Sequence, residues 1–265
     1  MRKISIVLPC YNCETTIIET LVSIVSQTYK DYQLIVVNDG STDSSLRIIK
    51  EFLNLSGVRY KVIDRENKGF LYSIIEAIDA SSSNFIARID ADDVWKKDHL
   101  AIIMLEFSKD ENLVLLGSQG EQIDSKSNVI GLYHKLPKDH DGVVKYLHKD
   151  NPFIHSSVVF SRKAYISAGG YLNDGNERNT HIAEYILWFE MSRIGMCKNL
   201  SHITVRYRVL ESSLSRSMNL VKNYQARLFV MKKVANHYNN HKLFSWLSRL
   251  KVFVRIAQSY CTGKK

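Results

Sequence analysis

The chain has 265 residues, 45% of them hydrophobic, which is enough for one large α/β core with at most a small appendage. Its formal net charge is +9, and residues 212–265 hold eleven basic residues and no acidic one. No apolar run is as long as a membrane span, no signal-peptide profile follows Met1, and the four cysteines are too scattered for a disulfide framework. These features exclude an integral membrane protein and a disulfide scaffold, and they predict a cytoplasmic location.

Strands and helices alternate in the first 110 residues. Short apolar segments predict strands at about 4–8, 33–37, 58–63 and 85–89. Helical periodicity follows each of them, at about 15–28, 43–54, 69–80 and 96–109. This rhythm predicts βαβ units around a mostly parallel sheet.

The rest of the chain follows a different pattern. Strands predicted near 113–118, 129–133 and 156–160 lack regular helix partners, so we expect mixed or antiparallel pairing there. A polar stretch at 173–180 predicts a loop that leads into a helix carrying Glu184. From about residue 219 the pattern predicts two amphipathic helices, broken near residues 239–240.

Three acidic residues directly follow the apolar segment at 85–89, namely Asp90, Asp92 and Asp93. Carboxylates this close repel one another unless a positive charge lies among them, and oxygen ligands suit Mg²⁺ or Mn²⁺. The alternative is a solvated acidic turn that caps the next helix. A cation at this position indicates a diphosphate as the ligand.

A second acid, Asp39, comes two residues after the apolar segment at 33–37 and is followed by Gly40 and Ser41. The alternative is that these residues form an ordinary strand–turn–helix junction, which would have the same residue pattern. In open α/β sheets, however, ligands bind beyond the carboxyl ends of the strands. Two successive strand ends with acids therefore favour a ribose contact and a metal contact.

Several ordered segments between Ile4 and about Ser215 together resemble glycosyltransferase family 2, the inverting nucleotide-sugar transferases of GT-A fold. The segments that carry the resemblance are residues 5–12, 36–43, 67–69, 88–93, 151–158, 169–171, 183–188 and 207–208. The resemblance implies an α/β fold with a Rossmann-like nucleotide-binding half and a mixed sheet. We therefore expect a GT-A domain at 1–217, with a nucleotide-sugar half at 1–110 and an acceptor half at 111–217, followed by basic helices at 218–265.

The resemblance also implies nucleotide contacts. They fall on Pro9, Tyr11 and Asp39 for the base and ribose, on Lys68 for uracil or phosphate, and on Asp90 for the ribose side. Arg88 lies beside the acids, and its planar fork suits either a carboxylate or phosphate oxygens.

The remaining roles concern the metal, the acceptor and the base. The resemblance implies that Asp92 is the principal ligand of Mn²⁺ or Mg²⁺ and that Glu184 is the general base. It places Asp93, His155 and Arg208 near the acceptor or donor sugar, although a histidine at a strand end is as often only packed there. Arg206 and Arg208 alternate on a strand, so only one of them should face the site.

Two positions depart from the family pattern. Glu184 stands where the family has an aspartate, and Ala183 replaces the glutamate before it. Leu210 stands where many members have a histidine near the metal or diphosphate. These departures keep open a non-catalytic nucleotide-sugar-binding or scaffold protein of the same fold.

The expected activity is transfer of a hexose or N-acetylhexosamine from a nucleotide sugar, with UDP as the expected nucleotide, to a glycan or polyprenyl-linked acceptor of a bacterial surface polysaccharide. The basic tail predicts peripheral binding to the anionic inner face of the cell membrane, although its apolar face would also suit packing on the domain. No recognised motif supports nucleic-acid binding. Cys10 and Cys13 have C-x-x-C spacing, but no second pair of ligands supports a zinc site.

Overall fold

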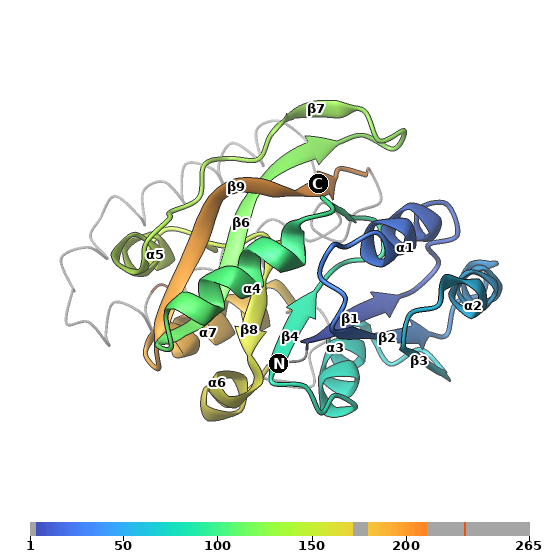
Figure 1. Ribbon diagram of the computed structural model, residues 1–265, viewed down its shortest axis with the longest axis horizontal. Coiled ribbons are helices and arrows are strands. Elements are labelled where there is room, and N and C mark those ends of the chain that lie inside the picture. Colours follow the sequence, from blue (N-terminus) through green and yellow to red (C-terminus); the bar gives the residue numbers. More distant parts are fainter. Residues whose placement is uncertain (1–3, 172–179, 211–230, 232–265) are drawn as a thin grey trace, which may run out of the picture.

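The computed structural model describes residues 4–171, 180–210 and 231, without the side chains of 180–182. The amino-terminal half alternates strands and helices as the sequence predicts: β1 (Ile4–Cys10), α1 (Ile17–Val25), β2 (Tyr32–Asp39), α2 (Ser45–Ser56), β3 (Tyr60–Arg65), α3 (Phe70–Asp79) and β4 (Phe85–Arg88). The four strands are parallel, with β1 between β2 and β4. The predicted βαβ units are thus confirmed (Figure 1).

The second half mixes short and long elements: β5 (Val94–Trp95), α4 (His99–Lys109), β6 (Leu113–Ile123), β7 (Val129–Leu132), α5 (His140–Leu147), a 3₁₀ turn (His155–Ser157), β8 (Val159–Ser161), α6 (Arg162–Ser167), α7 (Thr180–Ser192) and β9 (Met196–Arg208). The strand order is β3-β2-β1-β4-β8-β6-β9-β5, and β7 pairs with β6. β8 is antiparallel to β4 and β6, whereas β9 is parallel to β6. The expected mixed pairing is confirmed, and β4 and β8 join both halves in one sheet.

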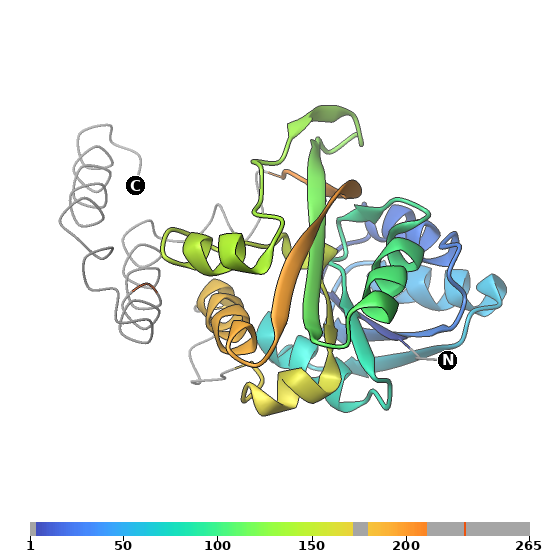
Figure 2. The same ribbon diagram turned by 60° about the vertical axis from the view of Figure 1, so that its left-hand side comes forward.

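Each face of the sheet carries its own core. Side chains alternate along β1, so Ile6 and Leu8 lie in one core and Val7 lies in the other. Helices α1, α2 and α4 pack on the first face, and α3, α5, α6 and α7 on the second (Figure 2). Because both faces are covered, β1 is buried throughout and β2 almost throughout, and both strands are predominantly apolar in sequence.

Several elements of the structure differ from the predicted ones. The segment near 156–160 begins with a 3₁₀ turn, and the strand predicted near 113–118 extends to Ile123. The sequence indicated only a short strand at 206–208, but β9 runs from Met196 to Arg208. The predicted helices at 218–265 lie outside the described residues, so that division of the chain stays a prediction. Every helix in the described part is too short or too polar to cross a membrane.

Candidate active site

The loops that follow β1, β2 and β4 meet at one edge of the sheet. The backbone N–H of Asn12 donates to Ser41 Oγ at 3.1 Å, and Thr42 N donates back to Asn12 Oδ1 at 2.8 Å. From α1, Thr20 Oγ1 donates to the carbonyl of Asp93 at 2.8 Å. The parallel strand ends therefore bring the acids of β2 and β4 to the same side, as the sequence predicts.

Asp39 is buried at the end of β2. Its Oδ1 accepts hydrogen bonds from the Arg65 guanidinium and from the backbone N–H of Lys68, the latter at 2.8 Å. Gly40 makes this arrangement possible, because its φ is +70° and a Cβ there would lie 2.6 Å from Asn67 N. Both of these bonds use Oδ1, so Oδ2 is the oxygen suited to a ligand hydroxyl.

The other predicted nucleotide residues surround this edge. Pro9 is buried within β1, whereas Tyr11 is 52% exposed on the following loop. The ammonium of Lys68 lies 4.9 Å from the centroid of the Tyr72 ring, and the Arg65 guanidinium lies at the same distance. Tyr72 was not singled out in the sequence, because an aromatic residue on an amphipathic helix carries no signal of a site.

Asp90 is held by two partners. Its Oδ1 accepts from Arg88 Nη2 at 2.7 Å, and its Oδ2 accepts from Ser156 Oγ at 3.2 Å. Burial acts to raise the pKa of Asp90, but the charges of Arg88 and His155 and these hydrogen bonds outweigh it and leave the pKa below its ordinary value. Asp90 therefore stays ionised.

In the other two acids of the cluster, burial and the neighbouring acids outweigh the groups that lower the pKa. Burial, followed by the charge of Asp90, raises the pKa of Asp92 to about 6. Burial and the charges of Asp92 and Asp90 raise the pKa of Asp93 well above its usual range. Asp93 Oδ1 accepts from the backbone N–H of Arg208 at 2.8 Å, whereas Oδ2 has no partner among the described residues. With all three carboxyl groups ionised, this part of the site would have an excess of negative charge.

The excess charge fits a hard divalent cation. Within the described part of the chain, no three His, Cys, Asp or Glu side chains converge as a complete ligand set. Mg²⁺ and Mn²⁺ sites of nucleotide enzymes commonly use one or two carboxylates and take the remaining ligands from phosphate and water. Asp92, with the orphaned oxygen of Asp93 nearby in the chain, matches that requirement.

Arg88 is fully buried beside the cluster. Its Nη2 binds Asp90, but Nε and Nη1 have no partner among the described residues. The guanidinium lies 4.9 Å from the centroid of the Phe70 ring. A buried guanidinium with unused donors is costly, and an anionic oxygen such as that of a phosphate would satisfy it.

Glu184 and His155, which the sequence suggested separately, lie in contact. Glu184 is 4% exposed on α7, and its Oε1 contacts Nδ1 of His155 in the 3₁₀ turn. The other ring nitrogen, Nε2, lies 3.1 Å from the Tyr171 hydroxyl. Tyr171 follows the turn at Gly169 and Gly170, both with positive φ, and its partnership with His155 has no sequence signal. The carboxylate is thus held in a buried chain of polar contacts.

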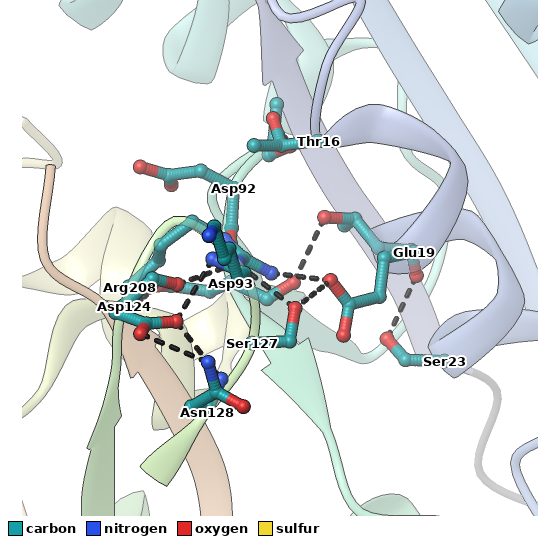
Figure 3. A network of polar contacts seen from close by, with 12 residues as sticks. Thr16, Glu19, Ser23, Asp92, Asp93, Asp124, Ser127, Asn128 and Arg208 are labelled. Atoms are coloured by element: carbon teal, nitrogen blue, oxygen red, sulfur yellow. Dashed lines mark hydrogen bonds and ion pairs between the residues drawn. The ribbon is translucent and has the colours of Figure 1, made fainter. Parts of the chain in front are cut away.

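Arg208 lies between the acidic motif, α1 and the turn between β6 and β7 (Figure 3), and its role near a sugar stays a prediction. Its guanidinium is 1% exposed and donates to the carbonyls of Asp92 at 2.7 Å and Asp124 at 2.8 Å. It also donates to Ser127 Oγ at 3.0 Å and pairs with Glu19. Arg208 therefore fixes the backbone of the acidic motif to α1 and to the turn between β6 and β7.

Arg206 lies two residues before Arg208 on β9. Its side chain is 41% exposed and donates to Glu121 Oε1 at 2.8 Å. Residues two apart on a strand point to the same face, so alternation does not separate the two arginines, and which of them faces the site stays a prediction. At the edge of β1, Cys10 and Cys13 are buried free thiols with their sulfurs 2.8 Å apart.

A mixed sheet that is covered on both faces, with acids at the ends of the parallel strands β2 and β4 on either side of β1, matches the GT-A fold. A sequence profile described as Glycosyl transferase family 2 matches residues 5–168, more than half of the chain. The chain belongs to this family.

Relatives and solved structures agree with this assignment. An uncharacterized glycosyltransferase of Haemophilus influenzae is 28% identical over 89% of this chain and 74% of its own length. A chondroitin synthase of Escherichia coli is 26% identical over 76% of this chain, which spans 28% of that longer protein. The structure is similar to that of S. aureus TarS in complex with UDP-GlcNAc, with a TM-score of 0.73 and 16% identity over 91% of this chain and 70% of that chain. A mannosyltransferase from Pyrobaculum calidifontis, in complex with GDP-Man and Mn²⁺, gives a TM-score of 0.62 with 14% identity over 98% of this chain and 81% of that chain.

Proposed function

We propose that this glycosyltransferase moves a hexose or N-acetylhexosamine, with inversion, from a UDP-sugar to a glycan or polyprenyl-linked acceptor during synthesis of a bacterial surface polysaccharide such as an O-antigen, a capsule or a lipooligosaccharide. The observation that carries the proposal is the buried contact between Glu184 and His155. His155 also acts electrostatically on Asp90, and Glu184, Asp90 and Arg88 all act on Tyr171. A carboxylate suited to take a proton is thus close to groups suited to hold a diphosphate.

Each chain residue has a chemical task in this reaction. Asp39 accepts a hydrogen bond from the ribose, and Tyr11 and Pro9 border the base. Arg88 donates its unused N–H groups to diphosphate oxygens, and Lys68 adds charge at the rim. Asp92, with Asp93 beside it, would hold Mn²⁺ or Mg²⁺, which supplies positive charge against the departing diphosphate.

The transfer step itself is a displacement at the anomeric carbon. Glu184 takes the proton of the acceptor hydroxyl while that oxygen forms the new bond to the anomeric carbon from the face opposite the diphosphate. The bond from the anomeric carbon to the diphosphate oxygen breaks, and the nucleoside diphosphate leaves with the electron pair. His155, in contact with Glu184 Oε1, is a positioning residue for the base.

The relatives support the donor and pathway classes. The chondroitin synthase makes a polysaccharide by its name, and the TarS complex contains UDP-GlcNAc. The mannosyltransferase complex contains Mn²⁺ and a GDP-sugar, so the test of the donor must include guanosine as well as uridine nucleotides.

The substitution Glu184→Gln tests the base, because the amide has nearly the same shape but cannot accept the proton. We expect unchanged donor affinity and a fall in transfer of at least about 10²-fold. Glu190→Gln on the same helix is the matched control, since Glu190 pairs with Arg193 near the surface. Unchanged transfer by Glu184→Gln would place the base elsewhere, and equal loss in both variants would indicate a general effect on the helix. Higher activity of Glu184→Asp than of the wild type would show that the longer glutamate side chain is a less effective base at this position.

The second candidate is a non-catalytic nucleotide-sugar-binding protein, and Leu210 in place of the family histidine favours it. The two candidates differ in turnover. Incubation with a panel of UDP-, GDP- and other nucleotide sugars and Mn²⁺ should give metal-dependent hydrolysis for the enzyme. Tight nucleotide binding without any hydrolysis or transfer would support the second candidate.

We also propose that residues 218–265 hold the protein at the anionic inner face of the membrane. Eleven basic residues and no acid follow Glu211, and anionic lipid attracts each basic residue near its surface with on the order of 1 kcal/mol. Full-length protein should bind anionic vesicles reversibly with salt, and truncation after Ser217 should abolish binding while hydrolysis survives. Equal flotation of both forms would contradict the proposal.

A further inference from the structure

Arg65, the last residue of β3, is surrounded by acceptors from the protein itself. Its Nε donates to Glu76 Oε2 at 2.6 Å, and its Nη2 donates to Ser73 Oγ at 2.9 Å. Its Nη1 donates to the carbonyl of Glu66 at 2.8 Å and to Asp39 Oδ1. These four hydrogen bonds use nearly all of the guanidinium donors, so this arginine is not suited to bind a diphosphate directly.

The sheet and the following helix place Arg65 between two elements. Asp39 and Arg65 are partners in the parallel register of β2 and β3. On α3, Ser73 and Glu76 lie three residues apart and therefore on one face of the helix. The guanidinium also lies 4.9 Å from the centroid of the Tyr72 ring on the same helix. Arg65 thus ties the carboxyl end of β2 to α3.

The charge of Arg65 matters most for Asp39. The side chain of Asp39 is 4% exposed, whereas that of Glu76 is 29% exposed and is partly hydrated. A buried carboxylate without a cation is costly. In the described part of the chain, Arg65 is the basic side chain that forms an ion pair with Asp39.

This arrangement leaves one oxygen of Asp39 for a ligand. Oδ1 accepts from both Arg65 and the backbone N–H of Lys68, and Oδ2 accepts no hydrogen bond from the described residues. An ionised carboxylate only accepts hydrogen bonds, so its ligand must supply a donor such as a hydroxyl. We propose that Arg65 is a positioning residue that fixes Asp39 for a ribose hydroxyl, so that the site selects nucleotides with a complete ribose. The inference rests on the proposed function, in which the donor is a nucleotide sugar.

Calorimetry of the full-length protein with UDP and 2′,3′-dideoxy-UDP tests this role, because the analogue lacks both ribose hydroxyls. Wild type should bind UDP at least about tenfold more tightly than the analogue, as expected for a hydrogen bond to a charged group. Arg65→Met removes the N–H groups from a side chain of similar length. It should bring the ratio of the two affinities below about threefold, with the affinity for the analogue nearly unchanged.

Arg47→Met is the matched control, since Arg47 pairs with Glu51 on the surface of α2 and should keep the wild-type ratio. Near-ultraviolet circular dichroism checks that each variant is folded. If Arg65→Met does not fold, Arg65→Lys replaces it, because lysine keeps the charge but cannot hold Asp39, Ser73 and Glu76 together. A folded Arg65 variant with the wild-type ratio would overturn the positioning role. Equal affinity of wild type for UDP and its analogue would overturn the hydroxyl contact.

A double variant separates positioning from direct contact. If Arg65 acts only through Asp39, adding Arg65→Met to Asp39→Ala should change the ratio no further, because the two losses are not additive. A further fall would mean that Arg65 itself touches the nucleotide and would overturn the proposal. GDP and its dideoxy analogue form a parallel series. Absence of UDP and GDP binding by wild type would reject the proposed function together with this inference, whereas ribose selection without hydrolysis or transfer would keep the inference and reject the enzyme.

Discussion

Replacing Arg208 by lysine isolates the role of the buried guanidinium, because the charge is retained and the planar fork is lost. In the folded protein this group donates to two carbonyls, those of Asp92 and Asp124, to Ser127 Oγ and to Glu19. The single ammonium of lysine cannot reach all the acceptors that surround the guanidinium, so we expect at least two of these hydrogen bonds to be lost.

The magnitude follows from burial. Hydrogen bonds from charged groups contribute about 1.5–3 kcal/mol each, and the acceptor carbonyls lie around a side chain that is only 1% exposed. Glu19 is 39% exposed and can be rehydrated, so its ion pair with Arg208 contributes less than about 1 kcal/mol to the free energy of unfolding. Since such losses are not additive, Arg208→Lys should lower the free energy of unfolding by about 3 kcal/mol.

Urea unfolding followed by the fluorescence of the buried Trp95 and Trp188 measures this change. A Mn²⁺ titration of donor hydrolysis should also show a higher half-saturating concentration, because the carbonyl of Asp92 loses its anchor. Arg206→Lys is the matched control: this side chain lies two residues earlier on β9, is 41% exposed and should change stability by less than about 1 kcal/mol. Equal stability and equal Mn²⁺ response of the two variants would refute the anchoring role.

Three further outcomes are expected. Asp92→Ala should remove divalent-cation dependence and nearly all turnover, and retained activity in chelator would contradict the metal assignment. Asp39→Ala should weaken UDP binding by roughly 1.5–3 kcal/mol, measured by calorimetry; unchanged affinity would remove the ribose role. Burial lowers the pKa of His99, which contacts Thr204, from 6.5 to about 3, so the unfolded chain takes up a proton first as pH falls. Folding stability should therefore drop by about 2 kcal/mol between pH 7 and pH 5, and His99→Gln should lack that part of the slope.

Motifs at the ends of regular elements could be predicted from the sequence. Asp39 and Asp90 each lie at the end of a mostly apolar segment, and parallel strands place their carboxyl ends at one edge, so local pattern and simple topology suffice to bring the acids together. The order of motifs likewise identified the family, which the profile match confirms.

Contacts that join distant segments could not be predicted in this way. Glu184 meets His155 only because α7 packs beside the 3₁₀ turn, and neither local periodicity nor spacing encodes that approach. Nothing in the sequence around Arg208 indicates that its side chain is enclosed by α1, the acidic motif and the β6–β7 turn. Local sequence fixes which residues end strands and which faces are apolar, because those depend on backbone period and hydrophobic burial. Partners of buried charged groups were decided only by the tertiary structure, because each must find oppositely charged or polar atoms wherever the packed chain supplies them.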